Sequence, residues 1–370
     1  LFLTALKMVI IPLILSSIIS GVTSMGGGKN LGRLGLKTIV YYISTSIIAI
    51  LTGLLLVNII KPGVGVELGF TQTVEGIADK ALSLEDVFLR IIPANIFEAM
   101  ANGDILSIIF FAVIFGVFIS QTGEKYRRTL TTFFEAFFEV LMRMTMFIIR
   151  FTPLGIFGIV AREVNKNADQ LANLAGSMAV YMLTVFLGLL IHAFFTLPLI
   201  VRIFGAAKPY KHLKNMMTPL LTAFSTASSS ATLPLTIEAV ENKSGVSNKI
   251  SSFTLPLGAT INMDGTALYE CVAAMFIAQV YGIEMHFTQQ LLVVVTALLA
   301  SIGAAGIPMA GLVMLTVILS AVGLPLEGIG LIIAVDLILD MTRTAVNVWS
   351  DTCGAVIIAR SENEETNVGL

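Results

Sequence analysis

Five polar residues recur at helical spacing in the apolar run from 329 to 359: Asp336, Asp340, Arg343, Asn347 and Asp351. At about 100° per residue they fall within roughly 80° of one helix face. Ionisable groups in a membrane helix are costly, and they usually face the bundle interior along a substrate or ion path. A salt-bridge ladder between helices is the alternative for Asp336 alone. Because Arg343 lies mid-run, far from either end, the whole stripe indicates a binding site.

The residue types suggest what this stripe binds. Arg343 offers a planar fork of donors that matches a carboxylate in bidentate geometry. Asp340, one turn away, can pair with an ammonium group, and Asn347 and Asp351 carry hard oxygens suited to an alkali cation. One cationic and one anionic anchor on neighbouring turns therefore favour an amino acid with an additional carboxylate.

A second group of residues lies in GATINMDGT, residues 258–266. Asn262, Asp264 and Gly265 are poor residues for a helix interior. Together they predict an unwound stretch whose carbonyls and carboxylate bind a cation, with an ordinary kink as the alternative. Glu270 follows one turn after Thr266. A carboxyl group in a site of low dielectric constant can take up a proton, but a structural hydrogen-bond role for Glu270 is equally open.

Other polar residues carry weaker signals. The hydroxyl cluster Tyr41–Ser46 says little alone, because Ser and Thr often bond their own helix. Cys271 and Cys353 lie in apolar stretches and are expected to pack rather than pair. The three histidines are far apart and show no metal-ligand spacing; they are His192, His212 and His286.

The composition identifies the solvent around these residues. Of 370 residues, 56% are hydrophobic and only 12% are charged, against about 25% charged in soluble domains. Most of the surface must therefore face lipid. A net charge of −2 gives no reason to expect a nucleic-acid partner. The chain begins inside an apolar run without a charged leader, so we expect a further helix before it rather than a signal peptide.

Long apolar runs predict the membrane segments, since a helix needs about 20 apolar residues to cross the hydrocarbon core. They lie at 1–25, 38–60, 104–121, 129–160, 172–202, 252–281, 290–322 and 329–359. Basic clusters fall on alternate connections, which places those connections in the cytoplasm. The first of these clusters is Lys29, Arg33 and Lys37, expected in the loop after the first run.

Two segments of the C-terminal half, 215–250 and 288–326, are apolar stretches interrupted by small and turn-forming residues. Each apolar arm, at roughly 10–15 residues, is too short to span a bilayer. We therefore predict two re-entrant hairpins, one from each side of the membrane, with kinked ordinary spans as the alternative. Paired interrupted segments are a good sequence indicator of a transporter binding site.

Four motifs in order, SSSATLP (228–234), GATINMDGTALYE (258–270), SIGAAGIPMAG (301–311) and DMTRTAVNVWSD (340–351), resemble the dicarboxylate/amino acid:cation symporter family. This family includes the excitatory glutamate transporters and archaeal aspartate transporters. The resemblance covers nearly the whole chain. It implies an all-α membrane protein with the glutamate-transporter fold: eight transmembrane helices, the first preceding this chain, and two re-entrant helical hairpins. It also implies a homotrimer in the plasma membrane or the bacterial inner membrane.

By the same resemblance, a scaffold would hold an elevator-like transport domain. Residues 1–60 would supply a scaffold helix and a transport-domain helix, and 61–214 mostly scaffold and trimerisation helices, with one transport-domain helix near 172–202. The transport core would be 215–360, and 361–370 a cytoplasmic tail. That core would contain a hairpin at 215–250, a broken helix at 252–281, a hairpin at 288–326 that gates the outside, and the last helix at 329–359.

The resemblance also implies the site residues. Substrate would contact Ser229, Thr266, Ile307, Gly311, Asp340, Arg343, Thr344 and Asn347. One sodium site would use Gly258, Asn262, Asn347 and Asp351, and a second Thr260, Met263, Ser301 and Ile302. A third would use Tyr42, Thr45, Ser46, Asn262 and Asp264.

Three positions bear on the substrate. Ala227 stands where archaeal members carry an arginine, and Met341 where animal carriers carry one. Glu270 matches the proton-coupled glutamate carriers, where archaeal aspartate carriers usually have glutamine. We therefore expect a sodium-coupled symporter of glutamate or aspartate, with proton coupling open. A C4-dicarboxylate symporter is the alternative, although Asp340 would be an awkward neighbour for a second carboxylate.

Two other classes of protein fit less well. A gated anion channel could use the same polar lining. An intramembrane hydrolase would need a base beside the serines of 225–230, and the sequence places neither His nor Lys there. We therefore do not expect an enzyme.

Overall fold

The structure is a computed structural model in which the chain folds into helices. It describes residues 8–9, 11–12, 15–16, 18–20, 22–23, 29–65, 92–102, 105–149, 151, 171–303 and 310–370. Within these residues every regular element is helical, apart from one isolated antiparallel bridge between Ala207 and Gly369. The predicted all-α class is confirmed for this part of the chain.

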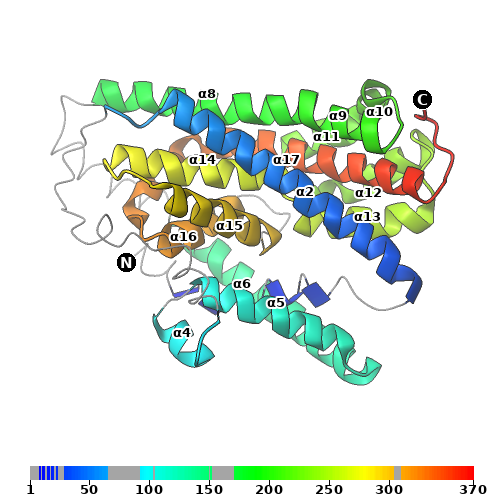
Figure 1. Ribbon diagram of the computed structural model, residues 1–370, viewed down its shortest axis with the longest axis horizontal. Helices are drawn as coiled ribbons and strands as arrows, with labels where there is room; N and C mark the ends of the chain where they lie inside the picture. The colour runs from blue at the N-terminus through cyan, green and yellow to red at the C-terminus, as the bar shows by residue number, and fades with distance from the viewer. Residues whose placement is uncertain are drawn as a thin grey trace.

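The first 215 residues contribute two sets of helices. One set, α4 to α6, lies together below the main body in Figure 1. The other set runs alongside the C-terminal helices. The bounds are α2 (Lys29–Ile60), α4 (Ile96–Asn102), α5 (Ile105–Gln121), α6 (Glu124–Ile149), α8 (Leu171–Ile191), the π-turn η2 (His192–Thr196), α9 (Leu197–Phe204) and α10 (Pro209–Asn215).

The C-terminal half consists of short helices and one long one. Two short pairs, α11 with α12 and α15 with α16, pack against each other across their interruptions. The bounds are α11 (Met217–Thr226), α12 (Ser229–Asn242), α13 (Asn248–Ile261), α14 (Asp264–Val280), α15 (Phe287–Gly303), α16 (Ala310–Ala321), the 3₁₀ turn η3 (Leu326–Gly328) and α17 (Ile329–Ser361).

Several predicted boundaries were wrong. Lys29, Arg33 and Lys37 belong to α2 and not to a loop. Long basic side chains can stay in a helix while their charged ends reach water, so the helix continues past its apolar part. The helix in the run predicted at 129–160 begins earlier, at Glu124, and is described as far as Ile149; residues 150 and 152–170 lie outside the described part, so the predicted end stays a prediction.

Two of the described helical stretches are long and apolar enough to cross a membrane, Arg33–Ile60 and Ala175–Phe204. Large apolar side chains are exposed on their outer faces, among them Leu55, Leu183 and Phe195. An extended apolar exterior of this kind is typical of a surface that meets lipid or another protein.

Helix α14 lies at the centre of the molecule. Every residue from Asp264 to Ala278 is buried, and α2, α8, α15, α16 and α17 all pack around it (Figure 1). A helix that is buried on all sides must have its polar residues satisfied by neighbouring helices. The functional groups of α14 are therefore fixed by five other elements.

The far end of α17 is tied to the beginning of α2. Lys37 Nζ lies 2.6 Å from Glu362 Oε1, and Arg33 contacts the other carboxylate oxygen. Hydrogen bonds from Lys37 and then Arg33 hold the pKa of Glu362 below its ordinary value. The positive charges thus hold two helix ends together at one end of the molecule.

Glycine allows α2 and α14 to approach closely. A Cβ atom at Gly53 would lie 3.0 Å from Leu268 Cγ and 3.0 Å from Val272 Cγ2. Small residues at such contacts are typical of packed membrane helices.

We predict that Gly53→Leu lowers the stability of the purified full chain by about 1–3 kcal/mol, because overpacking forces α2 away from α14. Gly176→Leu is the matched control, since Gly176 also lies in a helix but a Cβ there meets none of the described atoms within 4 Å. Thermal unfolding in detergent measures both variants. Equal midpoints for the two would contradict this account of the contact.

Candidate functional site

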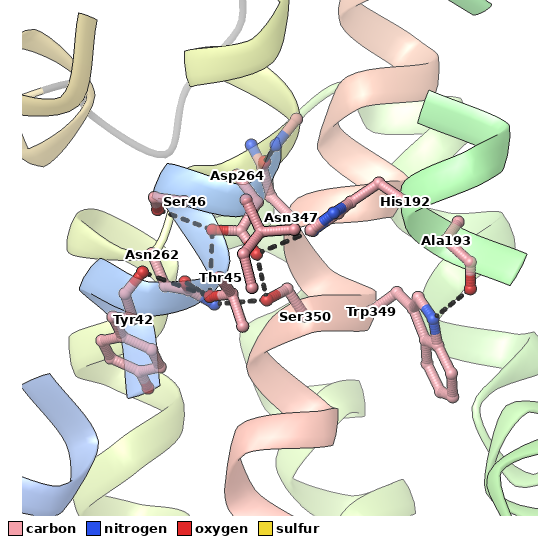
Figure 2. Close-up of polar contacts among 12 residues, drawn as sticks. Tyr42, Thr45, Ser46, His192, Ala193, Asn262, Asp264, Asn347, Trp349 and Ser350 are labelled. Atoms are coloured by element: carbon pink, nitrogen blue, oxygen red, sulfur yellow. Dashed lines mark hydrogen bonds and ion pairs between the residues drawn. The ribbon is translucent and has the colours of Figure 1, made fainter. Parts of the chain in front are cut away.

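The predicted unwound stretch is present between α13 and α14. Asn262 has φ −89° and ψ 78°, and Met263 has φ −108° and ψ 52°, so neither is helical. The side chains of Asn262 and Asp264 reach α2 and α17, as Figure 2 shows. The interruption therefore does what the sequence indicated: it places polar groups in the middle of a buried bundle.

Asp264 is fully buried, and its two carboxylate oxygens have different neighbours. Oδ1 accepts from Ser46 Oγ at 2.6 Å and faces Thr45 Oγ1 at 3.2 Å, both on α2. Oδ2 accepts from Ser350 Oγ on α17 at 2.6 Å and lies 3.1 Å from His192 Nε2 in η2. One carboxylate thus joins three other elements (Figure 2).

The hydroxyl of Thr45 has too many acceptors around it. Its Oγ1 lies 3.1 Å from the carbonyls of Tyr41 and Tyr42, 3.2 Å from Asp264 Oδ1 and 3.5 Å from Asn262 Oδ1. A hydroxyl has one proton to donate, so it cannot satisfy four acceptor oxygens. An acceptor-rich cluster of hard oxygens beside one carboxylate is suited to a small cation.

A neighbouring set of oxygens lies around Asp351. Asn262 Nδ2 donates to Asp351 Oδ1 at 2.9 Å and to Ser350 Oγ at 3.0 Å. Gly258 lies against the same carboxylate, since a Cβ there would collide with Asp351 Oδ1. The structure therefore brings together Gly258, Asn262 and Asp351 of the first predicted sodium set.

Asn347, the fourth member of that set, bonds to the beginning of α14. Its Oδ1 accepts from the Gly265 N–H at 2.7 Å, and its Nδ2 donates to Thr266 Oγ1 at 3.0 Å and to Met263 Sδ at 3.3 Å. One amide thus connects the first predicted sodium set to the predicted substrate residue Thr266.

The guanidinium of Arg343 is 1% exposed and points into the bundle. Nε donates to Asp340 Oδ1 at 2.9 Å and Nη1 to Asp336 Oδ1 at 3.2 Å. Nη2 lies 2.9 Å from Asp340 Oδ1 but is not aligned for a hydrogen bond, so it lacks such a partner in the described part. The guanidinium carbon lies 4.1 Å from the centre of the Tyr269 ring.

The beginning of α16 approaches this guanidinium. A Cβ at Gly311 would lie 3.0 Å from Arg343 Cζ and 3.0 Å from Thr266 Cγ2. Gly311 and Thr266 therefore lie beside Arg343, which contacts Asp340, so these four predicted substrate residues lie close together. Thr344 is also buried on α17.

The remaining predicted residues fall into three cases. Ser229 Oγ donates to the Ala259 carbonyl at 2.9 Å, which attaches the turn between α11 and α12 to α13. Ile307 lies outside the described residues. In the second sodium set, Thr260 and Ser301 each bond a carbonyl of their own helix. No hydrogen bond within the described ranges joins Thr260 or Met263 to Ser301 or Ile302. That set stays a prediction.

The turn between α11 and α12 contains Ala227, the position of one departure noted in the sequence. Ala227 adopts the left-handed conformation, with φ 48° and ψ 35°, and is 5% exposed. Ser228 then caps α12 by accepting from the Ala231 N–H at 3.2 Å. Residue 227 thus sits at the sharpest point of this interruption, beside Ser229.

Glu270 is fully buried within α14. Neither of its carboxylate oxygens has a hydrogen-bond partner among the described residues. This disfavours the alternative in which Glu270 is a structural hydrogen-bond partner.

Two residues of this cluster, His192 and Ser350, were missed from the sequence. His192 was set aside because it has no metal-ligand spacing, although it is an ionisable residue in the interior of an apolar run. Such a residue is itself a signal of function in a membrane segment. Ser350 directly precedes Asp351 on α17. A single serine beside ionisable residues gives no separate sequence signal.

Comparison with known proteins agrees with these motifs. The model of the family described as "Sodium:dicarboxylate symporter family" matches residues 1–361. The chain is 37% identical to an excitatory amino acid transporter of Caenorhabditis elegans, over 95% of the chain and 78% of that protein. It is 37% identical to a proton/sodium-glutamate symport protein of Geobacillus stearothermophilus, over 98% and 86%. A proton/glutamate-aspartate symporter of Escherichia coli K12 is 35% identical, over 98% and 84%.

The buried charges make a stability prediction. Arg343→Met leaves Asp336 and Asp340 buried without their cation, and loss of one partner of a buried pair costs about 3–5 kcal/mol. Asp336→Asn leaves one cation with one anion and should cost less. The double variant Asp336→Asn/Arg343→Met should be more stable than Arg343→Met alone.

Denaturation midpoints of the purified full chain test this. Arg143→Met is the control, because the Arg143–Glu139 pair is 80% and 62% exposed and such pairs contribute about 0–1 kcal/mol. A double variant no more stable than Arg343→Met would contradict the charge argument.

Proposed function

Because the chain belongs to the sodium:dicarboxylate symporter family, we propose that it is a secondary active symporter that carries glutamate or aspartate across a membrane together with sodium ions. Membership places it among integral membrane transporters. The names of its relatives, a proton/sodium-glutamate symport protein and a proton/glutamate-aspartate symporter, support this substrate class.

The observation that carries the proposal is the buried guanidinium of Arg343. Its Nη2 is enclosed by protein, 2.9 Å from Asp340 Oδ1 yet without an aligned hydrogen bond to any described residue. A buried donor without a partner costs free energy, and a side-chain carboxylate of a substrate can supply that partner in bidentate form. Gly311 lies against the same guanidinium, since even a methyl group there would crowd Arg343.

The amino group of the substrate is assigned to Asp340. Its carboxylate lies within one turn of Arg343 and contacts it, so a zwitterion that brings an ammonium to Asp340 and a carboxylate to Arg343 keeps both charges compensated. A C4-dicarboxylate would bring a second carboxylate to Asp340 and be repelled. This difference favours an acidic amino acid over succinate.

Sodium is assigned first to the oxygens around Thr45. Four acceptor oxygens around one hydroxyl fit a cation, and the single carboxylate of Asp264 matches one positive charge. Gly258, Asn262 and Asp351 would hold a second ion with Asn347. Within the described residues no three His, Cys, Asp or Glu side chains gather, so the donor sets are those of a hard alkali ion. Bound sodium would supply the positive charge at these sites, and the sodium gradient would drive the ion inward together with the substrate.

The two kinds of site share α14 and α17, which gives a route for coupling. Asn347 bonds Gly265 and Thr266 at the beginning of α14, one turn from Arg343. Cations bound at Asn262 and Asp264 would fix this beginning of α14 and thereby hold Thr266 and Asn347 in position for the substrate.

For the larger architecture we propose the arrangement that the resemblance implies. Residues 215–360, with the helix near 172–202 and the second helix of 1–60, move as a transport domain against a scaffold built mostly from 61–214. The segment 288–326 opens and closes the outer side. The exposed apolar faces of the helices support contact with lipid and with two further copies in a trimer. The chain would reside in a plasma or inner membrane.

A transport assay tests the substrate. We predict that the full chain in proteoliposomes accumulates glutamate or aspartate against its gradient only with inward sodium, and does not accumulate succinate. The pair Asp336→Asn/Arg343→Cys, which keeps charges balanced, should lose acidic substrates and accept small neutral amino acids. Asp336→Asn alone is the control and should retain acidic substrates.

Succinate uptake without amino acid uptake would refute the role of Asp340. Retained glutamate uptake in the double variant would refute that of Arg343. Flux of substrate down its own gradient, independent of the sodium gradient, would indicate a channel.

Protons are the second candidate for coupling, through Glu270. Because Glu270 is buried without a hydrogen-bond partner in the described part, we predict that Glu270→Gln removes the pH dependence of net uptake and spares exchange of internal for external substrate. Uptake and exchange from pH 5.5 to 8.5 measure this. An unchanged pH profile would assign Glu270 to packing.

A further inference from the structure

The π-turn η2 interrupts the helix formed by α8 and α9 at His192–Thr196, where the N–H of Leu197 donates to the carbonyl of His192. Pro198 follows and has no N–H to donate. Donors from outside the helix bind the two carbonyls next in line. Trp349 Nε1 donates to Ala193 O at 3.0 Å, and the Tyr210 hydroxyl to Phe194 O at 3.1 Å.

The π-turn keeps the buried faces of α8 and α9 on the same side of the helix. Along this stretch the fully buried positions are Tyr181, Thr184, Val185, Leu189, His192, Leu197 and Val201. Thr184 directly precedes Val185, and the other six are separated by four, four, three, five and four residues. An α-helix keeps one face with steps of three or four. The additional residue at the step of five lets His192 face the core without turning α9 away from it.

What His192 meets on that face is Asp264. Its Nε2 lies 3.1 Å from Asp264 Oδ2, and both side chains are fully buried. An ionised carboxylate only accepts hydrogen bonds, so Nε2 is the donor. Nδ1 has no partner within the described residues, so the contact with Asp264 is the hydrogen bond that orients the ring there.

The two donors to Oδ2, His192 and Ser350, determine where Oδ1 points. With Oδ2 held on the side of η2 and α17, Oδ1 is turned toward Thr45 and Ser46 on α2 (Figure 2). Groups that hydrogen-bond a metal ligand from behind fix its orientation, and their loss typically weakens metal binding about 10–100-fold.

We propose that His192 is a positioning residue for sodium: held by the π-turn, it fixes Asp264 so that Oδ1 faces the cation site formed by Tyr42, Thr45, Ser46, Asn262 and Asp264. This rests on the proposed function, because it assumes that the site binds sodium. The competing explanation is a histidine that only fills space between α8 and α14.

The chain contains its own reporter for this test. Trp349 is its one tryptophan, and its indole bonds the carbonyl next to His192. Intrinsic fluorescence of the purified full chain, titrated with NaCl at constant ionic strength and without substrate, therefore follows binding rather than transport. Sodium-dependent stabilisation against heat provides a second readout, since a ligand of the folded state raises the midpoint.

Two substitutions replace the imidazole of His192 by side-chain amides of different length, His192→Gln and His192→Asn. Glutamine can place its Nε2 near the position of the histidine Nε2, whereas asparagine is one methylene too short. We expect His192→Asn to raise the half-saturating sodium concentration about 10-fold or more, and His192→Gln to restore it to about the wild-type value. The KM for glutamate at saturating sodium should stay near wild type in both.

His212→Gln is the matched control. His212 is equally buried, its ring centre lies 5.2 Å from that of Trp349, and its Nδ1 bonds Ser244 Oγ at 2.8 Å, away from Asp264. This change should alter the fluorescence intensity and leave the sodium midpoint unchanged.

The outcomes separate the two hypotheses. A wild-type protein that responds to sodium in neither readout contradicts the cation site and with it the proposed function. A wild-type response with equal midpoints for His192→Asn and His192→Gln overturns the positioning role. Should His192→Asn fail to fold, Ser350→Ala removes the other donor to Oδ2, and an unchanged midpoint there would overturn the proposal.

Discussion

The structure depends on one constraint: charged groups in an apolar bundle must find their partners inside the protein. Asp264, Asp336, Asp340, Arg343 and Asp351 are all at most 3% exposed. Water cannot compensate their charges there, and an unpaired ion in such a place is strongly unfavourable. Asp264 and Asp351 therefore recruit donors from other helices, whereas Asp336 and Asp340 share Arg343 of their own helix. The first of these requirements sets which elements meet. The close approaches of Gly258 and Gly311 follow from it, because a side chain at either position would separate the charged groups from their surroundings.

The interruption between α13 and α14 is the backbone counterpart of this constraint. A continuous helix at Asn262 and Met263 would bond its own carbonyls and direct Asn262 and Asp264 to faces about 200° apart. Unwinding two residues lets both side chains turn toward α2 and α17. The π-turn η2 serves the same purpose from the other side, since it brings His192 to Asp264 while Leu197 stays in the core. Irregular backbone occurs where polar groups have to converge.

The sequence predicted this arrangement where the chemistry lay within one segment. The stripe from Asp336 to Asp351 has a period that a helix imposes, and the residues Asn262, Asp264 and Gly265 oppose a helix, so both features could be predicted. The helix boundaries were less certain, because charged residues such as Arg33 continue a helix beyond its apolar part. The roles of His192 and Ser350 could not be predicted, since neither belongs to a local pattern. They become functional candidates only when α8 and α17 pack against α14, and the π-turn that orients His192 leaves no clear signal beyond Pro198.

The contacts of Asp264 also bear on why a cation and an amino acid should affect each other's binding. Its Oδ1 faces α2 and its Oδ2 faces α17, the helix that carries Arg343. Asn347 then connects α17 to Thr266 on α14. A cation that attracts Oδ1 would have to pull against Ser350 and His192, so under the proposed function its binding energy would be transmitted to the helices that carry the proposed substrate residues. Coupling between two sites is reciprocal, so a substrate that orders the same helices must in turn strengthen sodium binding. The carboxylate of Asp264 would therefore connect the proposed cation site to the proposed substrate residues through a few hydrogen bonds.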